Sequence, residues 1–155
     1  MGSNAELYDA DFYTWCLTTA ALIRAGKWHD IDPESVAEEL ASVGHQEQEK
    51  VESLLQAVLS DLLIWWAQPE ERCGRWRSTI RGHRHDLLTI LQDSPSLQTA
   101  LPTMIAAEYP FVRAKALEAT RLYILPESCP FTSAQIVDRD FWPEGDTLTP
   151  EDVPR

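Results

Sequence analysis

The sequence predicts an all-α fold, a single-domain bundle of five to six helices with a loose polar C-terminal tail. Three observations predict it. Apolar residues recur every three to four positions over long stretches, which is the period of one helix face. Helix start and stop signals are frequent, and the alternating pattern of a half-buried strand is almost absent. We place the helical domain at residues 7–143 and a flexible tail at 144–155, and leave residues 1–5 out of the assignment.

The first predicted helix follows an acidic capping residue, Asp9 or Asp11, whose carboxylate can accept from free backbone N–H groups. It ends at Gly26, because glycine takes the left-handed conformation of a helix stop without steric cost. Its apolar stripe consists of Phe12, Trp15, Thr19, Leu22 and Ile23.

Asp32 and Pro33 open a short second helix, since proline loses no hydrogen bond at the first helical position. We expect this helix to end at Gly44. The strongest helical pattern then covers residues 45–67 and stops before Pro69, because the residue preceding a proline is disfavoured in a helix. The apolar face of that helix contains Val51, Leu54, Leu55, Val58, Leu62, Trp65 and Trp66.

A fourth helix is predicted over residues 74–92, and a fifth, with Ser94 as a plausible cap, runs to about Tyr123. Pro102 and Pro110 should break or kink the fifth helix, because each removes a donor and clashes with the preceding turn. A capping box that begins at Thr132 opens a short last helix.

Charge and composition exclude several classes of protein. The formal net charge of −12 repels nucleic acid and anionic membranes at long range. No apolar run approaches the 18–20 or so residues of a membrane span, and no signal peptide is visible, so we expect a cytoplasmic protein. The three cysteines are far apart and form no Cys-x-x-Cys pair, which argues against disulfides or structural zinc. No metal or cofactor is expected.

The segment Arg72–His85 is the most unusual stretch, with five arginines, two histidines and no acidic residue. On a helix, Arg77, Arg81 and Arg84 flank the apolar stripe. One interpretation has these arginines form ion pairs across the bundle with Glu38, Glu39, Glu47 or Asp61. The alternative is a surface for phosphate or nucleic acid, which the overall negative charge disfavours.

Two polar residues lie where apolar ones are expected. His83 falls inside an apolar stripe, where a histidine is more often a hydrogen-bonded core residue than a ligand or base. Asp61 borders the most apolar helix face and must be paired, protonated or turned to water, so we expect pairing with Arg77 or Arg81. An enzyme built on these residues would gather Glu39, Asp61, His83, Arg77 and Arg81 between helices. No nucleophile elbow or glycine-rich phosphate loop accompanies them.

Tryptophans and arginines are the candidate interaction residues. Trp65 and Trp66 span a helix face too broadly for equal burial, so one of them could line a dimer interface, although core packing of both is favoured. The residues that we select for interaction are Trp65, Trp66, Arg77, Arg81 and Arg84.

Several ordered motifs resemble a known family. They are residues 8–15, 22–26, 38–44, 62–65, 68–69, 76–80, 93–97, 129–130 and 140–143. Over residues 7–143 the chain resembles the bacterial family called domain of unknown function 29. The resemblance implies a small all-helical protein and supplies no activity, substrate or catalytic residue. The family often has histidine at the position of Asp61, which weighs against a catalytic role there.

Three functions remain open at this point. The first is a helical protein-interaction or self-associating module without catalytic activity, whose partner is itself or another protein. The second is a hydrolase or nuclease-like enzyme with the polar inter-helical site named above. The third is a nucleic-acid-linked regulator that uses the Arg72–His85 segment. An exposed apolar patch would favour the first, a pocket where carboxylate, histidine and arginine converge the second, and unpaired arginines fanned over one surface the third.

Overall fold

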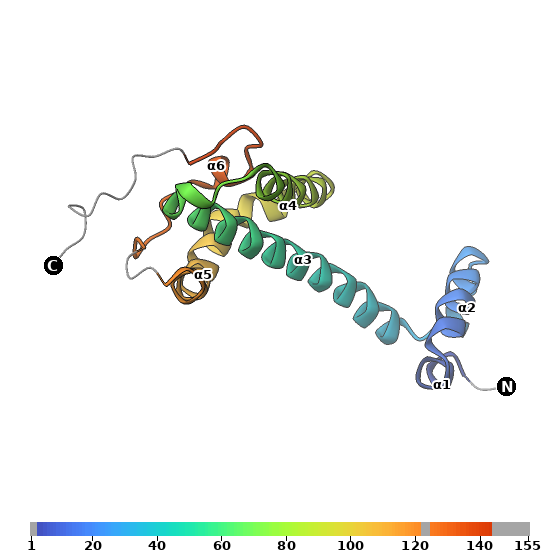
Figure 1. The fold of residues 1–155 in the computed structure, drawn as a ribbon. Coiled ribbons are helices and arrows are strands. Elements are labelled where there is room, and N and C mark those ends of the chain that lie inside the picture. Colours follow the sequence, from blue (N-terminus) through green and yellow to red (C-terminus); the bar gives the residue numbers. More distant parts are fainter. Residues whose placement is uncertain (1–2, 122–124, 144–155) are drawn as a thin grey trace. The chain divides into compact units, whose positions relative to one another are not determined.

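The computed structural model describes residues 3–121 and 125–143, and this part of the chain is helical with no strand (Figure 1). The all-α prediction is therefore confirmed; the predicted tail, residues 144–155, lies outside the described residues. The α-helices are α1 (Asn4–Ala10), α2 (Phe12–Arg24), α3 (Pro33–Ala67), α4 (Gly74–Asp93), α5 (Pro95–Thr120) and α6 (Ser133–Val137). Two short 3₁₀ turns, η1 (Trp28–Asp30) and η2 (Pro69–Glu71), connect α2 to α3 and α3 to α4.

The chain divides into two compact units, an N-terminal unit (Met1–Gln46) and a C-terminal unit (Glu47–Arg155). The boundary lies inside α3, so no loop, proline or glycine-rich linker marks it. The sequence analysis finds no domain boundary because an uninterrupted helix carries no such signal.

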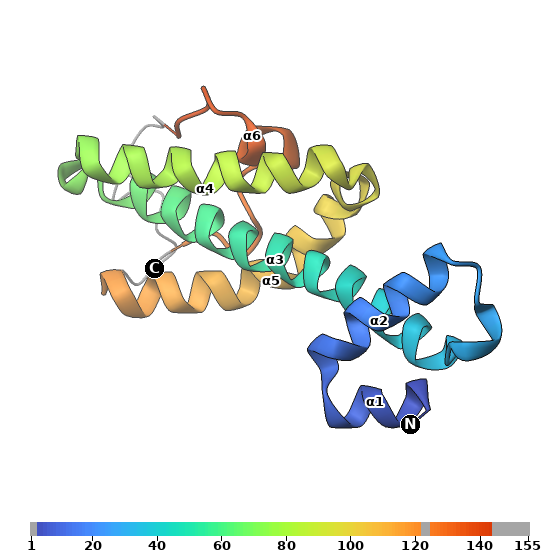
Figure 2. The ribbon, with the colours of Figure 1, turned by 90° about the vertical axis from the view of Figure 1, so that its right-hand side faces the viewer.

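The C-terminal unit has a continuous apolar core. Figure 2 shows α3 passing between α4 and α5, and apolar side chains from all three helices and from α6 meet there. The buried positions on α3 recur every three to four residues, which places one face of the helix in the core. The fully buried side chains of that face are Val51, Leu55, Val58, Leu59, Leu62 and Leu63.

The predicted helix signals act largely as expected. The backbone N–H of Thr14 donates to the Asp11 carboxylate at 3.0 Å, which caps α2, and Gly26 has a φ of 68° after its end. The hydroxyl of Ser35 donates to Asp32 at 2.6 Å at the start of α3. Thr132 forms the predicted capping box of α6.

Of the two predictions about helix breaks, one is wrong and the other holds only as a bend. α3 does not end at Gly44 but continues to Ala67. A glycine stops a helix by taking the left-handed conformation, and Gly26 is the one glycine with a positive φ among the described residues. α5 is not broken at Pro102 or Pro110 and remains one helix. Its axis does bend between the yellow start and the orange end of the ribbon (Figure 2).

Hydrogen bonds from the Asn4 side chain connect the elements of the N-terminal unit. The side-chain oxygen of Asn4 accepts from the Trp15 indole and from the backbone N–H of Asp32, both at 3.1 Å. Its amide nitrogen donates to the Thr19 hydroxyl at 2.9 Å. Asn4 thus joins α1, α2 and the start of α3, although the sequence analysis leaves residues 1–5 out of the fold.

Candidate functional site

Asp61 of α3 and His83 of α4 are in hydrogen-bonding contact within the C-terminal unit. Asp61 Oδ2 lies 3.0 Å from His83 Nδ1, and the Trp76 indole donates to Asp61 Oδ1 at 3.4 Å. The side chains of Asp61 and His83 are 21% and 34% exposed. A carboxylate on Nδ1 fixes the imidazole and leaves Nε2 available, which is the arrangement that orients a histidine as a general base. The structure therefore brings two of the five predicted polar-site residues together.

In the described part of the chain, Arg77 and Arg81 contact an aromatic ring and not a carboxylate. Within residues 3–121 and 125–143, neither guanidinium has an acidic partner within 4.0 Å, so the predicted ion pairs are wrong there. Both instead lie over the Trp142 ring, 4.7 and 5.7 Å from its centroid. The physical reason is competition, since Asp61 is already engaged by His83 and Trp76.

Glu39, the fifth predicted member, belongs to the N-terminal unit. The Tyr8 hydroxyl donates to Glu39 Oε1 at 2.6 Å. This hydrogen bond to an anion, together with desolvation, raises the pKa of Tyr8 to about 12. The carboxylate thus has a local structural partner on α1.

Arg84 is an internal residue. It is 0% exposed, and its guanidinium donates to the backbone oxygens of Ile136 at 2.8 Å and Phe141 at 2.7 Å. A third bond reaches the Gln135 oxygen at 3.1 Å. Burial lowers the pKa of the guanidinium, and the negative charge of Asp138 partly offsets this effect. Arg84 was selected as an interaction residue, but it has no exposed surface to offer a partner.

Arginine side chains donate hydrogen bonds to several backbone oxygens of the segment 125–143. Arg72 donates to the oxygens of Trp65 at 2.8 Å and Pro143 at 3.2 Å. Arg113 donates to Leu125 and Pro126 at 2.9–3.0 Å. Arg72, Arg84 and Arg113 therefore have structural partners.

Trp65 and Trp66 also face inward to different degrees. Trp65 is 3% exposed, and its ring centroid lies 5.2 Å from that of Trp76 and 5.0 Å from that of Trp142. Trp66 is half-buried against Phe131, at 6.3 Å between centroids. The two indoles therefore differ in burial, as the sequence predicts.

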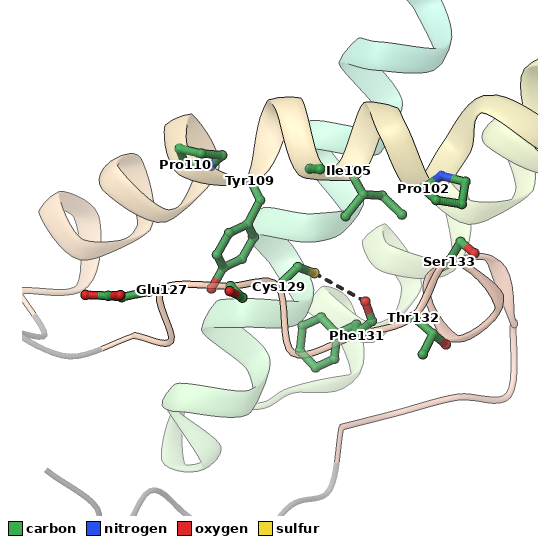
Figure 3. Close-up of a pocket in the computed structure, with 11 residues that line it drawn as sticks. Pro102, Ile105, Tyr109, Pro110, Glu127, Cys129, Phe131, Thr132 and Ser133 are labelled. Carbon is green, nitrogen blue, oxygen red and sulfur yellow. Dashed lines mark hydrogen bonds between the residues drawn. The ribbon is translucent and has the colours of Figure 1, made fainter.

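A groove of about 380 Å³ lies between α5 and the segment before α6 (Figure 3). Figure 3 shows Tyr109 reaching from α5 toward this segment, where Cys129 donates to the Phe131 oxygen at 3.4 Å. Burial raises the pKa of the Cys129 thiol, so it is not a thiolate nucleophile at neutral pH. Asp61, His83, Arg77 and Arg81 do not line this groove.

Tyr109 in this groove gives a testable pH dependence. Its hydroxyl donates to the Pro126 oxygen at 2.7 Å, and burial raises its pKa to about 12. An unfolded tyrosine ionises near pH 10, so the stabilisation by Tyr109 is full below that pH and is lost as the pH rises towards 12. We expect Tyr109→Phe to cost about 1 kcal/mol at pH 8 and less above pH 10. Urea unfolding of both chains at pH 8–11 measures this, and a difference that does not shrink would contradict it.

The most exposed apolar side chains gather in the N-terminal unit. Phe12, Tyr13, Leu17 and Ile23 come from α2, and Trp28, Leu40 and Val43 from η1 and α3; they are 37–73% exposed. We call these seven residues the apolar face. Ile23, Trp28 and Leu40 line one hollow of about 320 Å³, so the contributions of α2 and α3 adjoin.

The sequence analysis missed this face because it assigned Phe12 and Ile23 to the same buried stripe as Trp15. In the structure Trp15 is 3% exposed, whereas Phe12 is 50% exposed. The available signal was that α2 carries apolar residues around most of its circumference, more than one core-facing stripe requires.

Across residues 3–121 and 125–143, no three His, Cys, Asp or Glu side chains gather closely enough to hold a metal ion. No helix in this part of the chain has the length and apolar character that a bilayer crossing requires.

Comparison with known proteins places the chain in one family. No curated protein and no solved structure matches it. The family model described as Domain of unknown function DUF29 matches residues 7–142, which is most of the 155-residue chain. The chain belongs to the DUF29 family.

Proposed function

We propose that this chain is a helical protein-interaction module that docks through the apolar face of its N-terminal unit. One observation carries the proposal. Of the eight large hydrophobic side chains that are exposed in the described residues, seven lie in this unit of 46 residues. Such a concentration differs from the scattered exposed apolar residues of an ordinary surface and marks an interaction site.

The thin core of the N-terminal unit supports the same interpretation. Its buried side chains among the described residues are Trp15, Thr19 and Ser35. A helical unit of this size normally gains most of its stability by burying an apolar stripe. Here much of the apolar surface is left in water, so a partner that covers the apolar face would supply burial that the unit itself lacks.

The enzyme alternative has one supporting observation, the Asp61–His83 pair at 3.0 Å. A general base also needs a cavity in which a substrate can meet it. The groove of Figure 3 is lined by other residues, and Glu39 is bound by Tyr8 in the N-terminal unit. The interaction module is therefore the better supported function.

The nucleic-acid alternative is weakened by what the arginines contact. Arg72 and Arg84 donate to backbone oxygens, and Arg77 and Arg81 lie over Trp142. These groups do not fan out over one free surface, and the chain carries a net charge of −12. A polyanion would gain little from counterion release on such a protein.

Site-specific photo-crosslinking tests the proposed function. A photoreactive amino acid at Leu17, which is 58% exposed on the apolar face, should give protein adducts in the cells that make this chain. The same amino acid at Ala119, an exposed position on α5 in the C-terminal unit, is the control. Adducts at Leu17 well above those at Ala119 are the expected result, and equal yields at both positions would overturn the docking surface.

A further inference from the structure

We infer that the partner at the apolar face is a second copy of this chain, with the two α2 helices packed antiparallel about a two-fold axis. This inference rests on the proposed function and names its partner. It follows from the area of the face, from where apolar surface occurs in the chain, and from the charges at the two ends of α2.

The area of the apolar face is sufficient for a stable dimer. The three aromatic members are 50–73% exposed. An aromatic side chain has roughly 150–250 Å² of surface to bury, so the exposed surface of the three together is on the order of 400 Å². The four aliphatic members add on the order of 250 Å². A standard interface covers about 800 Å² per partner, of which a little over half is apolar. The face can therefore supply the apolar part of a standard interface by itself.

A second copy offers one apolar surface that can complement this face. In the C-terminal unit, as far as the structure describes it, Phe111 is the single exposed large hydrophobic residue. The apolar face must then meet its own equivalent, which is the isologous pairing that two-fold symmetry produces.

Helix geometry places some carboxylates away from the proposed contact and leaves others beside it. Successive residues of a helix turn by about 100°, so the four α2 members of the face fall within an arc of about 140°. On α3, Leu40 and Val43 share one side, whereas Glu34 and Glu38 lie on the other. Glu39 and Glu47 lie one turn before and after Val43 on its side, and each has a local partner, Tyr8 and Lys50 respectively.

The charges at the ends of α2 favour an antiparallel arrangement. Asp9 and Asp11 precede the helix, and Arg24 and Lys27 lie at its other end. When two copies of α2 run antiparallel, the acidic end of each lies beside the basic end of the other. The helix dipoles are then also favourably opposed. A parallel arrangement would place like charges together at both ends.

Sedimentation equilibrium of the full chain tests whether the partner is a second copy. We expect a dimer at about 100 µM, and Leu17→Glu should weaken dimerisation at least about 30-fold while the helical circular dichroism signal is retained. Phe111→Glu, which changes the exposed apolar residue outside the face, is the matched control and should leave the dimer intact. A dimer that Leu17→Glu does not weaken would overturn the apolar face as its interface.

Charge reversal tests the antiparallel arrangement. Asp9→Lys and Arg24→Glu should each weaken dimerisation about three- to tenfold, because each places like charges together twice. An equimolar mixture of the two variants should recover the wild-type affinity, since in the mixed dimer both contacts join opposite charges. Variants that bind as tightly as wild type, or a mixture that fails to recover, would overturn the arrangement.

The two proposals fail in distinguishable ways. A chain that stays monomeric at about 100 µM, yet gives Leu17 adducts with a different protein, would overturn the second copy as partner and leave the interaction module standing. A monomeric chain without adducts at Leu17 above the Ala119 control would overturn both.

Discussion

Replacing Arg84 with methionine is expected to lower the free energy of unfolding by about 3–5 kcal/mol. The guanidinium is fully buried and bonds three backbone oxygens. Two of these oxygens, from Gln135 and Ile136, belong to the last turn of α6, where helix carbonyls lack partners within the helix. A five-residue helix does not persist alone, so its loss should accompany that of the guanidinium. Urea unfolding followed by circular dichroism measures the change.

Arg81→Met is the matched control for this measurement. Arg81 occupies the same helix, is exposed, and contacts the Trp142 ring at 5.7 Å from its centroid. A cation–π contact at the surface contributes about 0.5–1 kcal/mol, so the control should lose no more than that. A similarly small loss of unfolding free energy in both variants would contradict the buried position of Arg84. The Arg72–His85 segment would then again be a candidate for a free basic surface.

The helix ends that can be predicted from the sequence are those where a side chain makes the capping bond. Asp11, Asp32 and Thr132 each accept from a neighbouring N–H or hydroxyl group, and this chemistry is local. Gly44 is different, because a glycine ends a helix only when the residues after it leave the helical conformation. The residues after Gly44 are mostly good helix formers, so α3 continues through it.

The polar site could be predicted in part. The sequence correctly predicts that Asp61, at the edge of an apolar face, has a polar partner. Which partner it meets depends on the rotation of α4 against α3, which periodicity does not specify, and the structure places His83 there instead of Arg77 or Arg81. Those arginines contact Trp142, a residue too distant in the sequence for helix periodicity to relate to them.

The apolar face could not be predicted because a core position and an interface position have the same chemistry in a sequence. Trp15 and Phe12 lie on one predicted stripe, yet one is buried and the other half exposed. The difference arises from what packs on α2, namely the short helix α1, which is too small to cover both sides. The same limit applies to the division into two units, since α3 continues through the boundary.

Trp65→Ala is expected to lower the free energy of unfolding by about 3–5 kcal/mol, because it leaves a cavity between Trp76 and Trp142. Trp65→Phe should cost clearly less, since it keeps an aromatic ring and removes an indole N–H that is buried without a partner in the described part of the chain. Both are measured by urea unfolding at low protein concentration. If Trp65 formed a dimer interface instead, Trp65→Ala would weaken dimerisation and leave the unfolding of the monomer unchanged. Its 3% exposure argues for the core, so a stable monomer of Trp65→Ala would contradict the packing of the C-terminal unit.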